Sequence, residues 1–275
     1  MDGGWTPADA ARVLREPTAA DDKYSRGVLG VRTGSTAYPG AAVLGVEAAW
    51  RTGVGMVRYV GPDRAADLVL ARRPETVTGE GRVQAWVIGS GTDAAAREAA
   101  ETDALQALLA GEAPVVVDAG ALDLAPGAAA PVLVTPHERE HTRLRDALGL
   151  APRRDRIGAA RETAAALGGC VLLKGSRTVV ATPSGWSTTL PAASAWLATA
   201  GTGDVLAGVV GAVVAAAAAR GAVDADELGP LAATGSWLHA QAAARAVAAA
   251  EGGPVTALDV AEQLPAAVGA LLRRG

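Results

Sequence analysis

Short β-rich runs alternate with alanine-rich helical stretches along most of this chain, and that alternation is the feature that most constrains its fold. The predicted strands lie near residues 28–32, 56–60, 83–88, 114–117, 132–135, 170–174 and 178–182. The predicted helices lie near residues 7–15, 41–52, 94–110, 138–148, 154–167, 204–220, 227–250 and 257–272. Strand–helix–strand order calls for right-handed crossovers. We therefore expect an α/β fold with three layers, α/β/α, around a mainly parallel central sheet.

Only three residues, 175–177, separate the last two predicted strands, so this pair could instead form a hairpin. The chain contains no internal repeat and no low-complexity linker. We therefore predict a helix and a polar arm over residues 1–27, followed by a single domain over residues 28–275. In a sheet of this kind, ligands bind in the loops at the carboxyl ends of the strands.

The charge pattern excludes several classes of protein. A net charge of −4 over 275 residues, without a basic block, offers nucleic acid or anionic lipid no broad binding surface. The amino terminus lacks the basic start and apolar stretch of a signal peptide. The longest apolar run, residues 205–219, is shorter than the roughly 20 residues of a membrane span. We expect a cytoplasmic protein with no nucleic-acid partner and no membrane partner.

A lone carboxylate, Asp204, is the only ionisable side chain in the 42 residues from Thr178 to Ala219. It follows residues 201–203, a Gly-Thr-Gly turn that leads directly into an apolar helix. Backbone N–H groups at a helix amino terminus bind anions, assisted by the helix dipole. A phosphate there, beside a carboxylate, would form an arrangement for phosphoryl transfer in which Asp204 accepts a hydroxyl proton.

A second interpretation of Asp204 is that it merely caps the helix, which aspartate often does. The absence of other charged side chains around it favours catalysis, because a lone carboxylate in an apolar region is costly unless it has a role.

Two neighbouring turns carry further candidates. Lys174 is one of only two lysines among 25 basic residues and ends an apolar predicted strand. It could lie near nucleotide phosphates or ribose, or it could be an ordinary solvated lysine. His137 enters a predicted helix with acids in its first turn, so it is either a ligand contact or an exposed cap. The three histidines lack metal-site spacing, and the chain has neither a Rossmann fingerprint nor a P-loop.

Taken in order, these turns resemble the motifs of the ADP/ATP-dependent NAD(P)H-hydrate dehydratase family, a branch of the ribokinase-like superfamily. The resemblance covers nearly the whole chain. The similar segments are GSTAYPGAAVLGVEAAWRTGVGMV, VIGSG, VVDAGAL, VTPHERE, LLKGSRTVVATPSG and, most specific of all, ATAGTGDVLAGVVGA.

The resemblance implies a ribokinase-like fold and a metabolite-repair enzyme. Such an enzyme restores NADH and NADPH from the S epimers of their hydrates, NADHX and NADPHX, at the expense of ADP or ATP with Mg²⁺. The nucleotide would phosphorylate the hydroxyl of the hydrate, and loss of phosphate would restore the dihydropyridine. The family also suggests a homo-oligomer.

The same resemblance implies roles for individual residues. Asp204 would be the base, and Gly201, Thr202 and Gly203 the anion hole. The residues in contact with the hydrate would be Ala41, Gly91, His137 and Asp204. The residues that hold the adenine nucleotide would be Lys174, Gly175, Ser176, Arg177, Thr178 and Gly203. No metal ligand is identified.

The chain departs from the family pattern at three places. Gly120 replaces an acid, Glu138-Arg139 replaces Pro-Gly, and residues 191–196 replace a segment rich in asparagine and glycine. The first two bear on magnesium or phosphate contacts, and the third bears on the shape of the substrate pocket. Two alternatives therefore stay open: a ribokinase-like kinase for a vitamin or sugar alcohol, and a degenerate paralogue that binds nucleotide without turnover. Sugar kinases of this type usually carry a β lid, and we expect no separate lid domain here.

Overall fold

The computed structural model describes residues 4–191 and 193–273. It is built around a nine-stranded sheet with the strand order β3-β2-β1-β4-β5-β6-β7-β8-β9. The strands are β1 (Val28–Arg32), β2 (Met56–Tyr59), β3 (Val77–Thr78), β4 (Ala85–Ile88), β5 (Val115–Val117), β6 (Val132–Val134), β7 (Cys170–Leu173), β8 (Val179–Ala181) and β9 (Ser187–Thr189). Strands β1 to β7 run parallel, whereas β8 and β9 pair antiparallel. The mainly parallel sheet is confirmed, and the pair β7–β8 is a hairpin.

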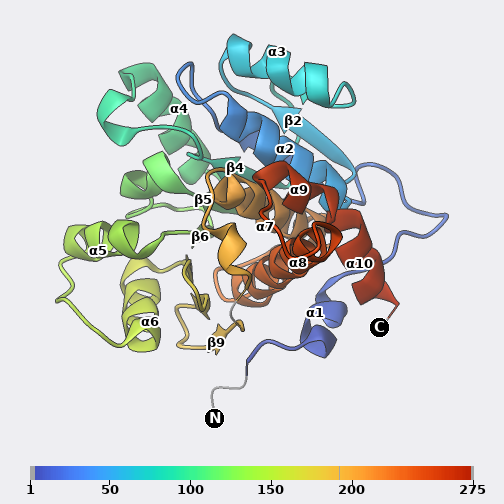
Figure 1. The fold of residues 1–275 in the computed structure, drawn as a ribbon. Coiled ribbons are helices and arrows are strands. Elements are labelled where there is room, and N and C mark those ends of the chain that lie inside the picture. The colour runs from blue at the N-terminus through green and yellow to red at the C-terminus, as the bar shows by residue number, and fades with distance from the viewer. Residues whose placement is uncertain (1–3, 192, 274–275) are drawn as a thin grey trace.

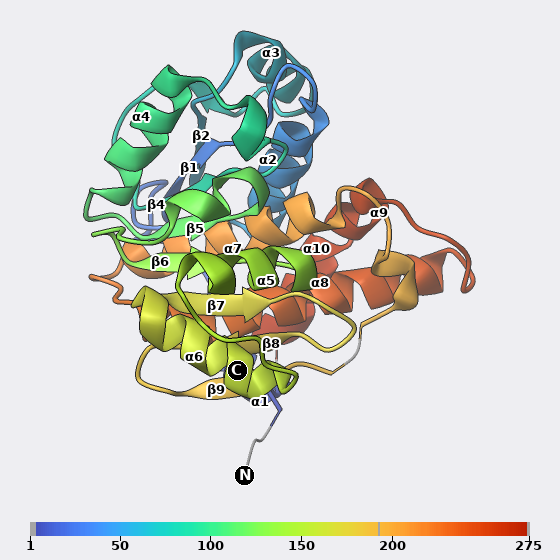
Figure 2. The same ribbon diagram turned by 90° about the vertical axis from the view of Figure 1, so that its left-hand side faces the viewer.

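Helices cover both faces of the sheet, which confirms the three layers (Figures 1 and 2). Helices α4, α5 and α6 lie on the face turned to the viewer in Figure 2, and α2, α7, α8, α9 and α10 lie behind the sheet. Helix α1 packs against α8, and α3 packs against α2. The helices are α1 (Pro7–Val13), α2 (Gly40–Thr52), α3 (Asp63–Arg72), α4 (Ala99–Leu109), α5 (Glu138–Ala147), α6 (Arg156–Leu167), α7 (Thr202–Ala218), α8 (Leu228–Ala249), α9 (Ala257–Glu262) and α10 (Leu264–Leu272).

Helix α7 is buried along most of its length because its sequence consists mainly of small apolar residues. A Cβ atom added to Gly208 would lie 2.2 Å from the Gly45 carbonyl oxygen of α2, so the two helix backbones are in direct contact. A Cβ atom on Gly211 would lie 2.2 Å from Cγ2 of Val87 in the sheet. Close-packed interiors transmit such contacts rigidly. The small residues thus fix α7, and the turn that begins it, against both α2 and the sheet.

The structure differs from the predicted elements at several places. It adds α3, β3 and β9, of which β3 is a two-residue strand with both residues exposed, too short to show a hydrophobic period. The predicted helix 94–110 is divided into a 3-10 turn, Ala94–Ala96, and α4 because Arg97 and Glu98 adopt extended backbone. The predicted helix 257–272 is divided into α9 and α10, with a proline in the first turn of α10. Proline is tolerated there but not inside a longer helix.

The apolar run at residues 205–219 forms most of α7 and belongs to the core, as expected. Within residues 4–191 and 193–273, none of the helices combines the length and the apolar character needed to cross a membrane.

Candidate active site

Four neighbouring parallel strands, β4 to β7, each end in a polar side chain, and these four side chains form one buried network. Asp118, which follows β5, accepts hydrogen bonds from Ser90 Oγ after β4 at 2.8 Å and from Thr135 Oγ1 after β6 at 2.7 Å. Lys174 Nζ after β7 donates to Asp118 Oδ1 at 2.8 Å. The carboxyl edge of the sheet is therefore cross-linked by a single carboxylate.

The pair Asp118–Lys174 is buried yet charged. Burial alone would raise the pKa of the Asp118 carboxyl, but the Lys174 charge and the three hydrogen bonds outweigh it and hold that pKa below its usual value. Burial would likewise lower the pKa of Lys174, but Asp118 outweighs it and keeps the pKa above its usual value. Lys174 is therefore not a solvated lysine at a strand end. It is a fixed cation at the centre of the carboxyl edge.

The amino terminus of α7 lies opposite this cation. A Cβ atom built on Gly203 would lie 3.7 Å from Lys174 Nζ. Gly201 precedes the helix in the left-handed conformation, with φ of 90°, which favours glycine. The turn thus presents the first backbone N–H groups of α7 beside a lysine, as an anion site requires.

Asp204 is the third residue of α7 and does not cap it, because the helix has no side-chain capping hydrogen bond. Within the described part of the chain its carboxylate has no hydrogen-bond donor and no ion-pair partner. Burial and the neighbouring Asp118 charge raise the pKa of Asp204 to about 6, although Lys174 lowers it in part. A carboxylate with that pKa is mostly deprotonated at neutral pH and can accept a proton.

Ala41 and Gly91 lie side by side near this edge. A Cβ atom on Gly91 would lie 2.3 Å from Cβ of Ala41, and Gly91 has a φ of 68°. Ala41 is the second residue of α2, and the same helix runs past α7, where a Cβ on Gly45 would lie 3.5 Å from the Asp204 carbonyl oxygen. These two predicted hydrate contacts are therefore adjacent: Ala41 lies on the helix that packs against the Asp204 turn, and Gly91 lies in the turn that follows β4.

His137 is the N-cap of α5. Its Nδ1 accepts hydrogen bonds from the backbone N–H groups of Arg139 at 3.1 Å and Glu140 at 3.2 Å, and Glu140 in turn accepts from the His137 backbone. The capping role is thus real. The ring is still half exposed, and it faces an open cleft of about 590 Å³ that Lys174, Gly175 and Ser176 also line. The structure therefore brings His137 to the same cleft as the turn at residues 174–176.

The predicted nucleotide turn joins β7 to β8 at the same edge. Gly175, Ser176 and Arg177 are exposed, whereas Lys174 and Thr178 at its two ends are half-buried. All the predicted site residues therefore gather around the carboxyl edge of β4–β7 and the start of α7 and α2.

A family model described as NAD(P)H-hydrate dehydratase matches residues 29–266, which is most of the chain. The chain belongs to the NAD(P)H-hydrate dehydratase family. A relative from Mycobacterium tuberculosis (strain ATCC 25618 / H37Rv), a bifunctional NAD(P)H-hydrate repair enzyme Nnr, is 45% identical over 224 residues, which cover 77% of this chain and 46% of the relative. The chain thus spans about half the length of the first curated relatives it matches.

Two further relatives match over most of their own length. An ADP-dependent (S)-NAD(P)H-hydrate dehydratase from Neisseria meningitidis serogroup B is 33% identical over 239 residues, covering 80% of this chain and 77% of the relative. The crystal structure of the ADP/ATP-dependent NAD(P)H-hydrate dehydratase from Bacillus subtilis, co-crystallised with ATP/Mg²⁺, superposes with a TM-score of 0.82. That pair is 26% identical and covers 98% of both chains. These matches support the ribokinase-like fold expected of the family.

Three residues of the site were not singled out from the sequence: Ser90, Asp118 and Thr135. Their signal is positional. Each comes one or two residues after a strand, and in a parallel sheet the carboxyl ends of neighbouring strands meet at one edge. Asp118 follows an all-valine strand, and because a buried carboxylate needs a partner, this position is a signal that could have indicated a nearby cation.

The structure gives a steric account of one departure from the family pattern. A Cβ atom on Gly120 would lie 2.3 Å from the Thr92 carbonyl oxygen, and the Gly120 carbonyl accepts a hydrogen bond from Arg97. The neighbouring loop leaves no room for the acid found in the family. Trp196, in the third departure, donates its indole N–H to the Gly252 carbonyl oxygen at 3.1 Å and is 45% exposed. Residue 192 of that segment lies outside the described residues.

The donor set at the edge suits a metal that arrives with a nucleotide. Mg²⁺ is usually held by one or two carboxylates together with substrate phosphates. In residues 4–191 and 193–273, no group of three or more His, Cys, Asp or Glu side chains could hold a metal ion. Asp118 is already committed to Lys174, Ser90 and Thr135, so its carboxylate is not free to bind a metal ion.

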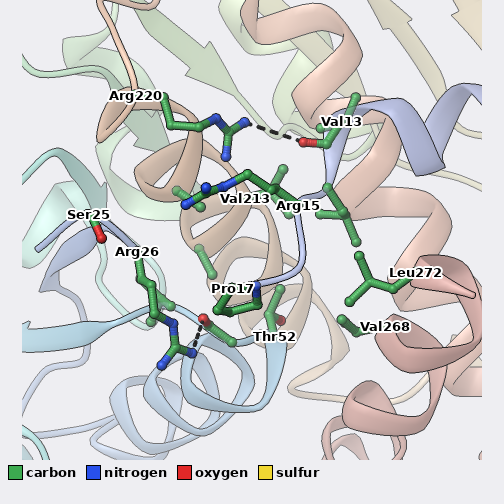
Figure 3. A pocket seen from close by; sticks show the side chains of 15 residues that line it. Val13, Arg15, Pro17, Ser25, Arg26, Thr52, Val213, Arg220, Val268 and Leu272 are labelled. Carbon is green, nitrogen blue, oxygen red and sulfur yellow. Dashed lines mark hydrogen bonds between the residues drawn. The ribbon is translucent and has the colours of Figure 1, made fainter. Parts of the chain in front are cut away.

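A further cavity lies away from this edge (Figure 3). It is formed by the amino-terminal arm, the carboxyl-terminal parts of α1, α2 and α7, and α10. Its three arginines all have partners: Arg26 donates to the Gly53 carbonyl oxygen at 2.9 Å, Arg220 donates to the Val13 carbonyl oxygen at 3.4 Å, and Arg15 pairs with the Asp21 carboxylate. None of the predicted site residues lines it, so it has no part in the candidate active site.

Proposed function

We propose that this protein restores NADH and NADPH from the S epimers of NADHX and NADPHX, using ADP or ATP with Mg²⁺. The observation that carries the proposal is Asp204. Its carboxylate has a pKa raised to about 6 and lies at the start of an anion-binding helix whose first turn faces Lys174. Relatives described as ADP-dependent (S)-NAD(P)H-hydrate dehydratases support the choice of substrate.

The chemistry requires a base and an anion hole, and the site supplies both. Asp204 takes the proton from the hydrate hydroxyl as its oxygen attacks the terminal phosphorus of the nucleotide. The bond to the bridging oxygen of the nucleotide breaks, so ADP leaves as AMP, or ATP as ADP. Backbone N–H groups of residues 201–203 and the Lys174 charge stabilise the transferring group. Phosphate then leaves the ring carbon, and a proton leaves the adjacent carbon, which restores the dihydropyridine.

The remaining predicted residues have distinct roles in this proposal. Ala41, Gly91 and His137 contact the hydrate. The turn from Lys174 through Gly175, Ser176 and Arg177 to Thr178, together with Gly203, holds the adenine nucleotide. Bound Mg²⁺ would neutralise the charge of the nucleotide phosphates, which would be its main ligands. We also propose a cytoplasmic homo-oligomer, in line with the family resemblance.

The proposal is tested by incubating the purified chain with NADHX, ADP and Mg²⁺ and following NADH absorbance. We expect NADH to form, with AMP and phosphate released in equal amounts. ATP in place of ADP identifies the preferred phosphoryl donor. A chain that is silent on NADHX and NADPHX with both nucleotides contradicts the proposal. Phosphorylation of a vitamin or sugar alcohol would then identify a kinase, and nucleotide binding without turnover would identify a degenerate paralogue.

A further inference from the structure

The nucleotide turn has little structure of its own. The backbone N–H groups of Gly175, Ser176 and Arg177 make no hydrogen bond to any described residue. Lys174, just before them, is tied to the Pro136 carbonyl oxygen at 2.8 Å. Three consecutive free N–H groups form a ready anion-binding surface. An exposed turn of this kind nevertheless needs an outside partner to keep one shape, because ordering a flexible backbone costs conformational entropy.

One side chain, Arg156 of α6, supplies that partner. Its Nη1 donates to the Arg177 carbonyl oxygen at 2.7 Å, and its Nη2 donates to the Lys174 carbonyl oxygen at 3.0 Å. Its Nε donates to Glu138 Oε2 at 3.1 Å. A single planar guanidinium therefore links the two ends of the turn and ties them to the first residue of α5, which lies next to His137.

Two features indicate that Arg156 stabilises the turn at residues 174–177 and not the helix α6 to which it belongs. It is the first residue of α6, where the helix dipole disfavours a positive charge. It also requires a glycine opposite, because a Cβ atom on Gly175 would lie 2.7 Å from Arg156 Nη2. The guanidinium lies directly against the turn backbone, and any larger residue at 175 would displace it.

We propose that Arg156 is a positioning residue for the adenine nucleotide. Its hydrogen bonds fix the carbonyl groups of Lys174 and Arg177, and with them the direction in which the N–H groups of the turn point, at the edge of the cleft that Arg156 also lines. The proposal rests on the proposed function for the identity of the nucleotide. A lysine cannot reproduce the role, because its single ammonium cannot bridge two carbonyls and a carboxylate in one plane.

The test compares three variants of the full chain: Arg156→Ala, Arg156→Lys and Arg161→Ala. Arg161 is the matched control, because it is an exposed arginine of the same helix without an ion pair among the described residues. Dissociation of ADP is measured by calorimetry, and KM for ADP and for the hydrate is measured separately. We expect Arg156→Ala to weaken ADP binding about tenfold or more. The hydrate KM should change less than the KM for ADP, because Ala41, Gly91 and Asp204 lie on other elements and Arg156 reaches His137 only through the neighbouring Glu138.

Amide hydrogen exchange provides a readout that does not depend on turnover. In Arg156→Ala, exchange of the Lys174 amide, which donates to the Pro136 carbonyl oxygen, should accelerate, while the core of β7 stays as protected as in the unsubstituted chain. Arg156→Lys should lie between the two, and it serves as the principal variant if Arg156→Ala does not fold by circular dichroism. Unchanged exchange and unchanged ADP affinity overturn the proposal, and so does faster exchange with unchanged ADP affinity. If the dehydratase assay itself fails, ADP binding and exchange still decide the role of Arg156.

Discussion

Two carboxylates in this molecule, the buried Glu47 and the half-buried Asp204, have opposite electrostatic surroundings. Glu47 in α2 is fully buried, but Arg51, Arg72 and Arg73 surround it. Burial alone would raise its pKa, yet hydrogen bonds from those three arginines outweigh burial and lower it to about 2. Asp204 in α7 has no such partners, and burial with the Asp118 charge raises its pKa to about 6.

The difference shows how the surroundings of one chemical group can fix its charge in one region and leave it able to titrate near neutral pH in another. Glu47 has three cationic partners, so its charge is fixed and it joins α2 to the end of α3. The nearest positive charge that acts on Asp204 is Lys174, and its attraction is weakened because Lys174 is already paired with Asp118. An underpaired carboxylate can take up a proton near neutral pH, which a threefold-paired one cannot.

The largest expected effect comes from removing the underpaired charge. Asp204→Asn should lower the rate of hydrate turnover about 10²–10⁴-fold, because the general base is lost while the shape of the side chain is kept. ADP affinity should change little, since the backbone N–H groups and the nucleotide turn remain. Turnover is followed by NADH absorbance and binding by calorimetry. Turnover within about threefold of the unsubstituted chain would remove Asp204 from the base role.

Removing the fully paired charge should affect stability instead of chemistry. Glu47→Gln leaves three arginines around a neutral amide and should lower the free energy of unfolding by about 2–4 kcal/mol. The pKa of Glu47 is lowered, so its stabilisation is present above the usual pKa of 4.5 and is lost as the pH falls toward about 2. The difference in free energy of unfolding between Glu47→Gln and the unsubstituted chain should therefore become smaller at acid pH. Urea unfolding at several pH values measures it.

The control for that variant is Glu75→Gln. Glu75 also pairs with Arg73, at 3.3 Å, but its side chain is 42% exposed. A solvent-exposed pair contributes at most about 1 kcal/mol. Equal losses in Glu47→Gln and Glu75→Gln would show that burial of the arginine cluster is unimportant.

Asp204→Asn should change stability in the direction opposite to Glu47→Gln. The pKa of Asp204 is raised in the folded chain, so the folded state binds a proton more readily than the unfolded state. Its contribution to stability therefore falls as the pH rises from about 4 to about 6 and stays unfavourable above that. At pH 8, Asp204→Asn should be more stable by about 1–3 kcal/mol, and the gain should vanish near pH 4. A loss of stability at pH 8 would show that the charge is satisfied after all.

The smallest expected effect is a shift of the pH profile. kcat/KM should fall on the acid side of about pH 6, as Asp204 becomes protonated. Lys174→Met removes the one charge that lowers the pKa of Asp204, so the acid limb should move up by about one pH unit. The shift is read from the position of the limb, independently of the overall loss caused by weaker nucleotide binding. If the acid limb of the kcat/KM profile stays at the same pH in Lys174→Met, the Lys174 charge does not lower the pKa of Asp204.

Much of the fold could be predicted because its strands are short apolar runs separated by long helices. The pattern failed at β3, which has two exposed residues, and at Arg97 and Glu98, whose extended backbone divides a continuous helical pattern. A hydrophobic period describes burial along one element. It does not register short edge strands or a local break, which neighbouring elements impose.

The site could be predicted at Asp204 and Lys174 because both stand out from their surroundings in charge. The scarcity of lysine was a useful signal only for Lys174, because Lys23 lies at the other end of β2, where a Cβ on Gly55 would meet its carbonyl oxygen. Ser90 and Thr135 were missed since single hydroxyl residues after strands are common. Their role depends on Asp118 lying between them, which only the strand order β4-β5-β6 establishes.

The most direct test of this contrast is a titration of the Asp204 side chain itself. The carboxyl ¹³C resonance of aspartate-labelled protein is followed against pH and assigned by its absence in Asp204→Asn. A midpoint near pH 6 is the predicted result, because burial and the Asp118 charge raise the pKa of Asp204, which has no ion-pair partner among the described residues. A midpoint at or below about 4, the value of an ordinary aspartate, would contradict the account.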